Sequence, residues 1–421
     1  MEKVKYSKNG IPVYSYINET QHTFYISLFL RAGSMHESDR DAGITHFLEH
    51  IAIRNINHIM MGELYKLLDR YGLDFNTATY SHLVHFHISG AKAHFRIAAD
   101  IISKLFLPIT LPKAEIDAER ERIRAEMREE REGTTLRAFT QKELFGDTAL
   151  SRSIMGSHGT VSKISRRRLE DYRRDVMAKD NCFLYVTGSV SDDEMEYLSE
   201  LVGEYRLNRG IRRMNLAPVP EGFGRRGARI AVKHSDYIKV RLSFDVDMSG
   251  TTLPELDLLY EQLLGGYSSE MFIELSEHRG LVYDISGAIE DYNNIAIFSI
   301  GYDVSLAHFY EALAGVIAIL ADFKREALPR DRFYNAAYID NQMNLLDDDS
   351  ELNFTLAQDN HFSELGYRDL EDRREAYRAV TPERLVEVAR DIFTQDNLTV
   401  TIKGNKRKLD LSRIKGIVNN I

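Results

Sequence analysis

The pattern H-x-x-E-H, formed by His46, Glu49 and His50, constrains the fold of this chain more than any other feature of its sequence. Residues three and four positions apart lie on one face of an α-helix, so these side chains converge on one point only if the segment is helical. Imidazole nitrogens are preferred zinc ligands, and a catalytic zinc takes three protein ligands while its fourth position holds water. The motif therefore predicts a helix that supplies two ligands of a Zn²⁺ ion.

Glu49 stands between the two predicted ligands and is too close to them in sequence to be a comfortable third ligand. Its carboxylate suits a general base that acts on a zinc-bound water, whose pKa falls to about 7. The alternative is that His46 and His50 merely flank an apolar helix and titrate in solvent. Two histidines with a glutamate at this spacing are typical of hydrolytic zinc sites, so we favour the metal interpretation.

The third ligand is expected on a second helix, which the carboxylate-rich segment 113–132 predicts. Most of its glutamates alternate with arginines and form a solvated face, stabilised by pairs four residues apart. Glu119 and Glu126 lie two turns apart on one face, beside the apolar Ile123 and Met127, which would turn that face inward. Spacing alone leaves four candidates for the third ligand: Glu115, Glu119, Glu121 and Glu126.

The H-F-L-E-H motif, followed downstream by E-R-E-R-I-R-A-E-M, resembles the pitrilysin (insulinase) metallopeptidases, or inverzincins, in particular the short processing-peptidase-like bacterial type. The resemblance implies that His46, His50 and Glu126 bind Zn²⁺. It also implies that Glu49 is the general base. Glu119, seven residues before the third ligand, then matches a further active-site carboxylate that orients the ligand set.

Two further segments extend this resemblance. Residues 30–34, L-R-A-G-S, are similar to the family's strand ending in R-A-G-S, and residues 76–79, N-T-A-T, are similar to its N-A-x-T edge strand. In the family, that edge binds the substrate backbone, which implies substrate-binding roles for Asn76 and Ala78. An edge strand with unpaired backbone groups aligns an extended peptide by β-augmentation, so the expected substrates are short or unfolded chains.

The order of predicted elements indicates a duplicated α+β fold. Arg, Gly and Pro cluster at 208–227, which predicts a linker between an N-terminal zinc-binding metallopeptidase domain, 1–207, and a homologous C-terminal domain, 228–421, that lacks the metal motif. Residues 64–73 and 272–281 are similar, and each is followed by a strand and an apolar helix. The resemblance implies two homologous halves, each an antiparallel sheet with helices on one face, which form a clamshell around the substrate.

The second half departs from the family at one position. The family segment L-R-x-x-x-x-L-x-Y supplies an Arg and a Tyr to the active site, whereas Leu275–Tyr283 retains Tyr283 but has Ser276 at the Arg position. We expect the Tyr283 hydroxyl near the oxyanion of the tetrahedral intermediate. Loss of the companion cation weakens the case that one chain is active by itself. Arg279 is better explained as a cation at a helix C-terminus. Because short family members act as homodimers or heterodimers, the departure predicts a homologous partner subunit.

Three histidines, His82, His85 and His87, form a rival cluster. In a strand His85 and His87 share a face while His82 points to the opposite one, and no carboxylate of matching geometry follows. A zinc site needs three or four converging ligands. We therefore expect a strand whose histidines line a wet face or the substrate groove.

Composition fits an ordinary enzyme. A chain of 421 residues with 43% hydrophobic and 28% charged residues can build two or more domains. A formal net charge of −10 makes nucleic acid an unexpected partner and favours a cationic peptide only weakly. The first residues lack an apolar stretch that could act as a signal or a membrane span, so a cytoplasmic location without membrane attachment is expected.

These observations predict a zinc endopeptidase that hydrolyses short or unfolded peptides. The resemblance to the family's short bacterial members implies that leader or precursor segments are among such substrates. The alternative is a non-catalytic or partner-dependent peptide-binding subunit of a heterodimeric peptidase. The enzyme is favoured because the chain retains His46, Glu49, His50 and Glu126, and a scaffold has no need of all four. Ser276 instead favours an active site whose groups come from two subunits.

Overall fold

The computed structural model describes residues 1–132, 135–235, 237–265, 267–326, 336–349 and 352–421. The chain divides into two compact units. Unit 1 comprises Met1–Gly133, Arg152–Asn215 and Met343–Leu370, and unit 2 comprises Thr134–Ser151, Leu216–Gln342 and Glu371–Ile421. The chain passes from unit 1 to unit 2 between Asn215 and Leu216, which lies within 208–227. The linker and the domain boundaries expected there stay predictions.

Unit 1 is built on a six-stranded sheet with the strand order β1-β2-β6-β3-β5-β4. The strands are β1 (Lys3–Tyr6), β2 (Pro12–Ile17), β3 (Thr23–Leu30), β4 (Asp74–Thr79), β5 (Val84–Ala91) and β6 (Cys182–Gly188). Neighbouring strands are antiparallel except β2 and β6, which are parallel. Among the described strands β4 pairs only with β5, so it is an edge strand.

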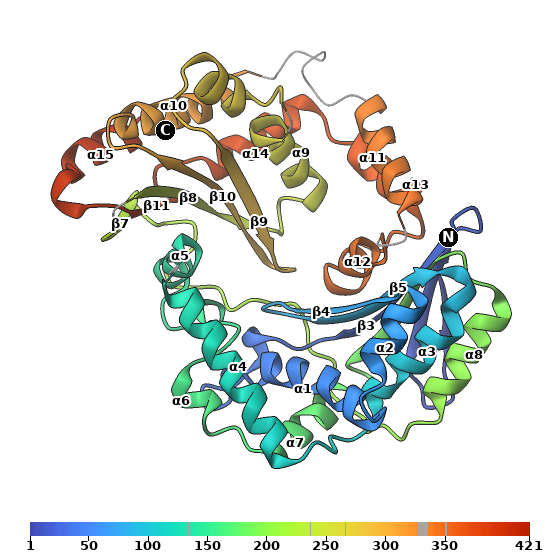
Figure 1. Cartoon of the computed structure of the whole chain (residues 1–421). Helices are drawn as coiled ribbons and strands as arrows, with labels where there is room; N and C mark the ends of the chain where they lie inside the picture. Colours follow the sequence, from blue (N-terminus) through green and yellow to red (C-terminus); the bar gives the residue numbers. More distant parts are fainter. Residues whose placement is uncertain (133–134, 236, 266, 327–335, 350–351) are drawn as a thin grey trace. The chain divides into compact units, whose positions relative to one another are not determined.

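Helices cover both faces of this sheet. They are α1 (Ile44–Ile59), α2 (Leu64–Tyr71), α3 (Phe95–Ser103), α4 (Lys113–Glu132), α6 (His158–Val161), α7 (Arg166–Val176), α8 (Asp192–Gly203) and α12 (Leu352–Ala357). Figure 1 shows α1, α2 and α3 on one face of the sheet and α12 on the other. A π-helix, Gln358–Phe362, follows α12, and α11 (Ala336–Asp348) precedes it.

The central strand β3 shows why two layers of helices are needed. Every residue of β3 after Thr23 is buried, and alternate residues of a strand point to opposite faces. Phe24, Ile26 and Leu28 belong to the large core under the helices on the first face. Phe29 belongs to a second core that includes residues of α12 and the π-helix. A strand buried on both faces appears in sequence as a continuous apolar run.

Unit 2 repeats this architecture with a five-stranded sheet in the order β7-β11-β8-β10-β9. The strands are β7 (Arg229–Lys233), β8 (Ile238–Asp247), β9 (Ile285–Asp291), β10 (Ile295–Val304) and β11 (Leu398–Lys403). The helices are α5 (Leu136–Phe145), α9 (Leu253–Leu264), α10 (Phe309–Phe323), α13 (Leu370–Arg378), α14 (Pro382–Ile392) and α15 (Leu411–Val418). α5 packs against β8 and β11, where the hydroxyls of Thr140 and Thr401 lie 2.5 Å apart.

The strand orders confirm the predicted α+β class with two homologous halves. The series β2-β6-β3-β5-β4 corresponds to β7-β11-β8-β10-β9, and the first pair of each series is parallel. The parallel pairs and the helix on the second face of each sheet were not predicted. α9 occupies the place of α1 but contains no histidine, so the H-x-x-E-H motif occurs in one half alone.

α10 is the strongly apolar helix that the sequence predicted in the second half. Its apolar side chains, including Leu313, Val316 and Leu320, are buried within unit 2. Across the part of the chain that the structure describes, no helix combines the length and the apolar character that a membrane span requires.

The second core of unit 1 generates a stability prediction. Phe362 is 2% exposed and packs on Phe29 and Phe183, with ring centroids 6.0 and 5.8 Å away. We expect Phe362→Ala to lower the free energy of unfolding by about 3–5 kcal/mol, through lost burial and a cavity. Leu345→Ala, at a side chain that is 56% exposed, is the control and should change it by less than about 0.5 kcal/mol. Because the chain has no tryptophan, urea unfolding is followed by circular dichroism, and equal effects would contradict the packing.

Candidate metal centre

The helix that carries the motif begins at a tightly constrained turn. Gly43, the residue before α1, has a φ of +91°, and a Cβ there would lie 2.3 Å from the Met155 carbonyl oxygen. The Glu37 carboxylate accepts hydrogen bonds from the backbone N–H groups of Gly43 and Thr45, both at 2.8 Å. A carboxylate at a helix N-terminus satisfies unpaired N–H groups and complements the helix dipole. These contacts set where α1 begins.

α1 and α4 pack antiparallel through a row of polar contacts, which we call the α1–α4 charge row. The pairs are His58 with Glu115, Arg54 with Glu115 and Glu119, His50 with Glu119 and Glu126, and His46 with Glu126. The four basic residues are each four positions apart, so they form one stripe along α1. Glu115 and Glu119 are four apart on α4, and Glu126 lies two turns beyond Glu119. The charge row therefore brings the motif against α4.

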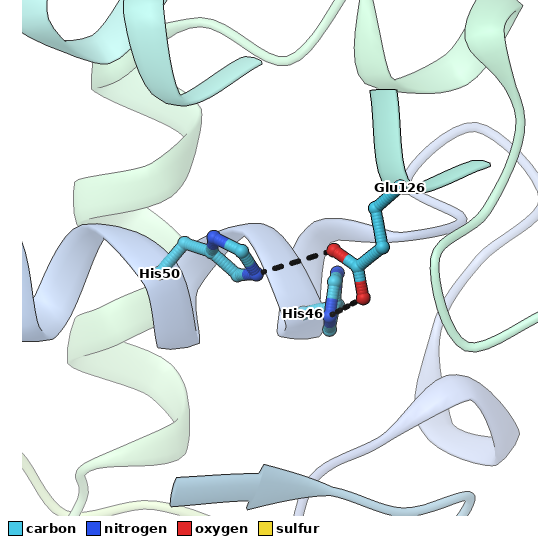
Figure 2. Close-up of side chains that lie close together, drawn as sticks. All are labelled: His46, His50 and Glu126. Carbon is cyan, nitrogen blue, oxygen red and sulfur yellow. Dashed lines mark ion pairs between the residues drawn. The ribbon is translucent and has the colours of Figure 1, made fainter. Parts of the chain in front are cut away.

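Three possible metal ligands meet at one end of the charge row. His46 Nε2 lies 3.7 Å from one oxygen of Glu126, and His50 Nε2 lies 3.6 Å from the other. Figure 2 marks both pairs with dashed lines. The three ligand atoms lie within 4.8 Å of one another, and no other such group occurs among the described residues. Ligands about 2.0–2.2 Å from a tetrahedral zinc are roughly 3.3–3.5 Å apart, so small side-chain adjustments suffice. The donor set and its spacing fit Zn²⁺.

The electrostatics of the site differ between its two histidines. Burial, together with the nearby His50, lowers the pKa of His46 to about 4, so its imidazole is neutral at pH 7. Burial also opposes charge on His50, but Glu119, 3.3 Å from Nδ1, and nearby carboxylates outweigh it and raise the pKa of His50. Burial acts to raise the pKa of Glu119, and the contacts with His50, Arg122 and Arg54 reverse this and lower it.

Glu49 lies beside this cluster and is 8% exposed. Burial raises the pKa of its carboxyl, although a hydrogen bond from Thr79 and the charge of His50 oppose the rise. The Thr79 hydroxyl donates to Glu49 Oε2 from the end of β4. Glu49 is therefore held from the sheet, independently of the three possible ligands, in a position where it can accept a proton.

Asn76 and Ala78 lie on β4, the edge strand, as the sequence predicted. Their side chains point to the face of the sheet opposite that of Thr79, because alternate residues of a strand face opposite sides. Both line a cavity of about 370 Å³ on that opposite face. The edge position suits backbone pairing, but the two side chains do not face the metal cluster.

Tyr283 belongs to unit 2, where it is 97% exposed. It follows the π-helix Phe272–His278, which contains Ser276, so its expected role near the oxyanion stays a prediction. Arg279 ends this helix and pairs with Glu311 at 2.6 Å. That contact agrees with a structural cation at the helix C-terminus.

The three histidines around β5 form no metal site with a neighbouring acidic residue among the described residues. His85 and His87 share a face of β5, and both line the 370 Å³ cavity. The expectation for His82 was wrong, because β5 begins only at Val84 and the alternation does not extend to His82. The His82 ring instead contacts Phe362, on the same side of the sheet as His85.

Two contacts of the site were not predicted. Arg54 pairs with Glu115 and Glu119, and its position four residues after His50 was a signal available in the sequence. The hydrogen bond of Thr79 to Glu49 joins segments that are distant in sequence and carried no such signal.

The family of the chain follows from its sequence profile. Residues 13–158 match the family described as Insulinase (Peptidase family M16), and residues 163–337 match the family described as Peptidase M16 inactive domain. The chain belongs to the insulinase family. The metal cluster lies in the part of this insulinase-family chain matched by the first profile, and the second match agrees with a half that lacks the motif.

Similar proteins cover nearly the whole chain. An uncharacterized zinc protease of Bacillus subtilis, YmxG, is 22% identical over 394 residues, which is 92% of this chain and 95% of that protein. A structure from Pseudomonas fluorescens described as a peptidase M16 inactive domain superposes with a TM-score of 0.82 at 15% identity, over 96% and 98% of the two chains. The periplasmic protease PqqL of Escherichia coli superposes with a TM-score of 0.78 at 16% identity, over 100% of this chain and 50% of PqqL. At these identities the structural likenesses show the fold alone.

The charge row generates a prediction about metal affinity. Arg54→Ala should weaken Zn²⁺ binding by about tenfold, because Glu119 loses a cationic partner and holds His50 less firmly. Arg122→Ala is the matched control, since Arg122 contacts the same carboxylate but its side chain is 68% exposed. Competition with a chromophoric chelator measures both affinities. Equal losses in the two variants would contradict the orienting role of Arg54.

Proposed function

We propose that the chain is a zinc-dependent endopeptidase that hydrolyses short or unfolded peptides. The observation that carries the proposal is the convergence of His46, His50 and Glu126 within 4.8 Å beside the buried carboxylate of Glu49. Two imidazoles and a carboxylate leave a fourth zinc position open, as catalytic sites require. The names of the similar zinc proteases support the choice of metal.

The proposed mechanism divides the work among four residues. His46, His50 and Glu126 would hold Zn²⁺, which when bound supplies a Lewis acid that acidifies water and polarises a peptide carbonyl. Glu49 accepts the proton of the attacking water and returns it to the leaving amine. Burial favours this role, because a raised pKa makes the carboxylate a stronger base.

Glu119 has a different proposed role from the ligands. It contacts Nδ1 of His50, the nitrogen that does not face Glu126, and is 2% exposed. A carboxylate in this position sets the ring orientation of a metal-binding histidine and increases its basicity. Glu119 therefore acts through His50 and is a positioning residue.

β4 is the proposed platform for substrate. An extended peptide that pairs with this edge strand would satisfy the unpaired backbone groups of both chains. Thr79, at the end of β4, contacts Glu49, so a peptide aligned on the strand would run beside the catalytic base. Asn76 and Ala78 contribute to this platform, their backbone to pairing and their side chains to the opposite face.

We propose that a homologous partner subunit, in a heterodimer or a homodimer, completes the site. Ser276 stands where the family pattern carries an Arg, so an active site built on that pattern would lack one cation beside Tyr283. PqqL supports pairing in a general way, since one PqqL chain is twice the length that matches here. Processing of leader or precursor peptides suits such an enzyme, because these substrates are unfolded.

A second candidate function is a peptide-binding subunit that supports a catalytic sister chain. Ser276 is the observation that favours it. Adding a catalytically active homologue to this chain distinguishes the two functions. If a variant of this chain in which His46 is replaced, so that it cannot bind zinc, still increases the activity of the homologue, the supporting role is favoured.

The base assignment generates a prediction. Glu49→Gln should retain Zn²⁺ but lower kcat by about 10²–10⁴-fold, because the amide cannot accept the proton. Glu126→Ala should lose both zinc and hydrolysis, since a ligand is removed. Zinc is measured by atomic emission and hydrolysis with a quenched fluorescent peptide. Retained activity in Glu49→Gln would end the base assignment.

The positioning role of Glu119 generates another prediction. Glu119→Gln should weaken zinc affinity by about 10–100-fold, less than Glu126→Ala does, because the ligands remain and only their orientation is relaxed. Chelator competition measures both variants. A loss as large as that of Glu126→Ala would make Glu119 a ligand instead.

The whole proposal is tested by zinc per chain, cleavage of an unstructured peptide library and light scattering on one preparation. Zinc with cleavage means a self-sufficient peptidase, and the molar mass then shows whether it is a monomer or a homodimer. Zinc without cleavage means that a partner supplies a missing group. Absence of zinc from a metal-replete preparation would contradict the catalytic function.

A further inference from the structure

Two threonines of the edge strand β4, Thr77 and Thr79, face the side of the sheet that α1 covers. Their partners across the β4–β5 pair are Phe86 and Val84, and both of these belong to the large core under the helices on that side. Residues directly opposite each other in an antiparallel pair lie on the same face of the sheet. Both threonine side chains therefore point into the layer that contains Glu49, and both have apolar neighbours across the strand pair.

The hydroxyls of these two threonines act on the same carboxylate. The Thr79 hydroxyl donates a hydrogen bond to Oε2 of Glu49. The Thr77 hydroxyl is buried and makes no hydrogen bond with any of the described residues. Burial raises the pKa of the Glu49 carboxyl, and the Thr77 hydroxyl opposes this rise together with Thr79. Glu49 is therefore the acceptor that both hydroxyls share, although only Thr79 bonds to it directly.

The carboxylate of Glu49 needs donors of this kind. Its residue is 8% exposed, and the charge of Glu126 acts against its own. A buried charge is unfavourable unless hydrogen bonds satisfy it, and a buried hydroxyl without an acceptor is unfavourable as well. A hydrogen bond from Thr77 to Glu49 would relieve both conditions at once.

Thr77 departs from the family pattern at this strand. The pattern N-A-x-T carries Ala where this chain has Thr77, and Thr where it has Thr79. Threonine is common in strands, so strand preference by itself could account for either residue. A buried hydroxyl needs an acceptor, however, which the methyl group of Ala does not. The second hydroxyl beside Glu49 is thus a feature of this chain and not of the pattern.

We propose that Thr77 and Thr79 are positioning residues that together hold the carboxylate of Glu49 from the edge strand. The inference rests on the proposed function, because it concerns the base of that reaction. Thr79 holds Oε2, which leaves Oε1 of Glu49 to accept the proton of the attacking water. Thr77 adds a second donor to the same carboxylate. Both threonines act through Glu49, and neither accepts a proton itself.

Crystal structures of the full-length chain, grown with zinc, test the geometry. Both hydroxyl oxygens are expected about 2.5–3.0 Å from oxygens of the Glu49 carboxylate. Thr79→Val should displace that carboxylate, whereas Thr79→Ser should leave it in place because the hydroxyl is retained. A Thr77 hydroxyl that bonds to another group, or an unmoved carboxylate in Thr79→Val, would overturn the proposal.

Hydrolysis measures the consequence for the reaction. Thr79→Val should lower kcat by about 10–100-fold and Thr77→Val by about three- to tenfold, because a misplaced base takes up the proton less efficiently. KM should change by less than about twofold, since the backbone groups that align a peptide are retained. Thr77→Ser and Thr79→Ser should restore kcat. A loss that appears in KM, or that serine does not rescue, would contradict the positioning role.

A double-mutant cycle shows whether the threonines act through Glu49. In the Glu49→Gln background, Thr79→Val and Thr77→Val should cause no further loss of kcat, because the base is already absent. Full additive losses there would overturn the proposal. Thr20→Val is the matched control, since the hydroxyl of Thr20 is exposed in the turn between β2 and β3 and bonds to Asn18 Oδ1 at 2.6 Å. It should change neither kcat nor the position of Glu49.

The crystal structures and the hydrolysis assay separate this inference from the proposed function. A displaced Glu49 carboxylate in Thr79→Val, with no cleavage by the unsubstituted chain, would keep the positioning role and count against solo peptidase activity. Cleavage with equal kcat by the unsubstituted chain, Thr77→Val and Thr79→Val would support the peptidase and overturn the positioning role.

Discussion

The packing of α1 against α4 through the charge row is the interaction on which the metal site depends. Three imidazoles, a guanidinium and three carboxylates are brought together in a partly dry interface, where Glu119 is 2% exposed. Removing such charges from water is costly unless each has a partner, and here Arg54 and His50 share the buried carboxylate. The pairing that offsets the cost of burying these charges also places His46 and His50 opposite Glu126. The packing of the two helices therefore determines the geometry of the proposed ligands.

β4 positions the proposed catalytic base beside this helix pair. Thr79 holds the carboxylate of Glu49 from the sheet, while the outer edge of the strand remains without a neighbour among the described strands. Because residues alternate along β4, one of its faces serves the metal cluster and the other borders an aromatic cavity. The proposed base, peptide platform and positioning threonines therefore all depend on the register of one short strand, and that register is set by its pairing with β5.

Local patterns in the sequence were sufficient for much of this picture. The spacing of His46, Glu49 and His50 predicted a helical stripe, and repeated segments predicted the duplicated fold that the two sheets share. The four glutamates of α4 could not be separated by spacing, because their difference lies in which turn of α1 each one meets. Residues 343–370, which complete unit 1, could not be assigned there, since their contacts with β3 and β6 join segments far apart in the chain.

Anomalous X-ray scattering at the zinc edge, from crystals of the zinc-loaded chain, is the most direct measurement of the site. One peak is expected at about 2.0–2.2 Å from Nε2 of His46, Nε2 of His50 and a carboxylate oxygen of Glu126, with Glu49 nearby but not bound to the metal. A peak elsewhere, or no peak at these residues in crystals of metal-replete protein, would contradict the proposed zinc site.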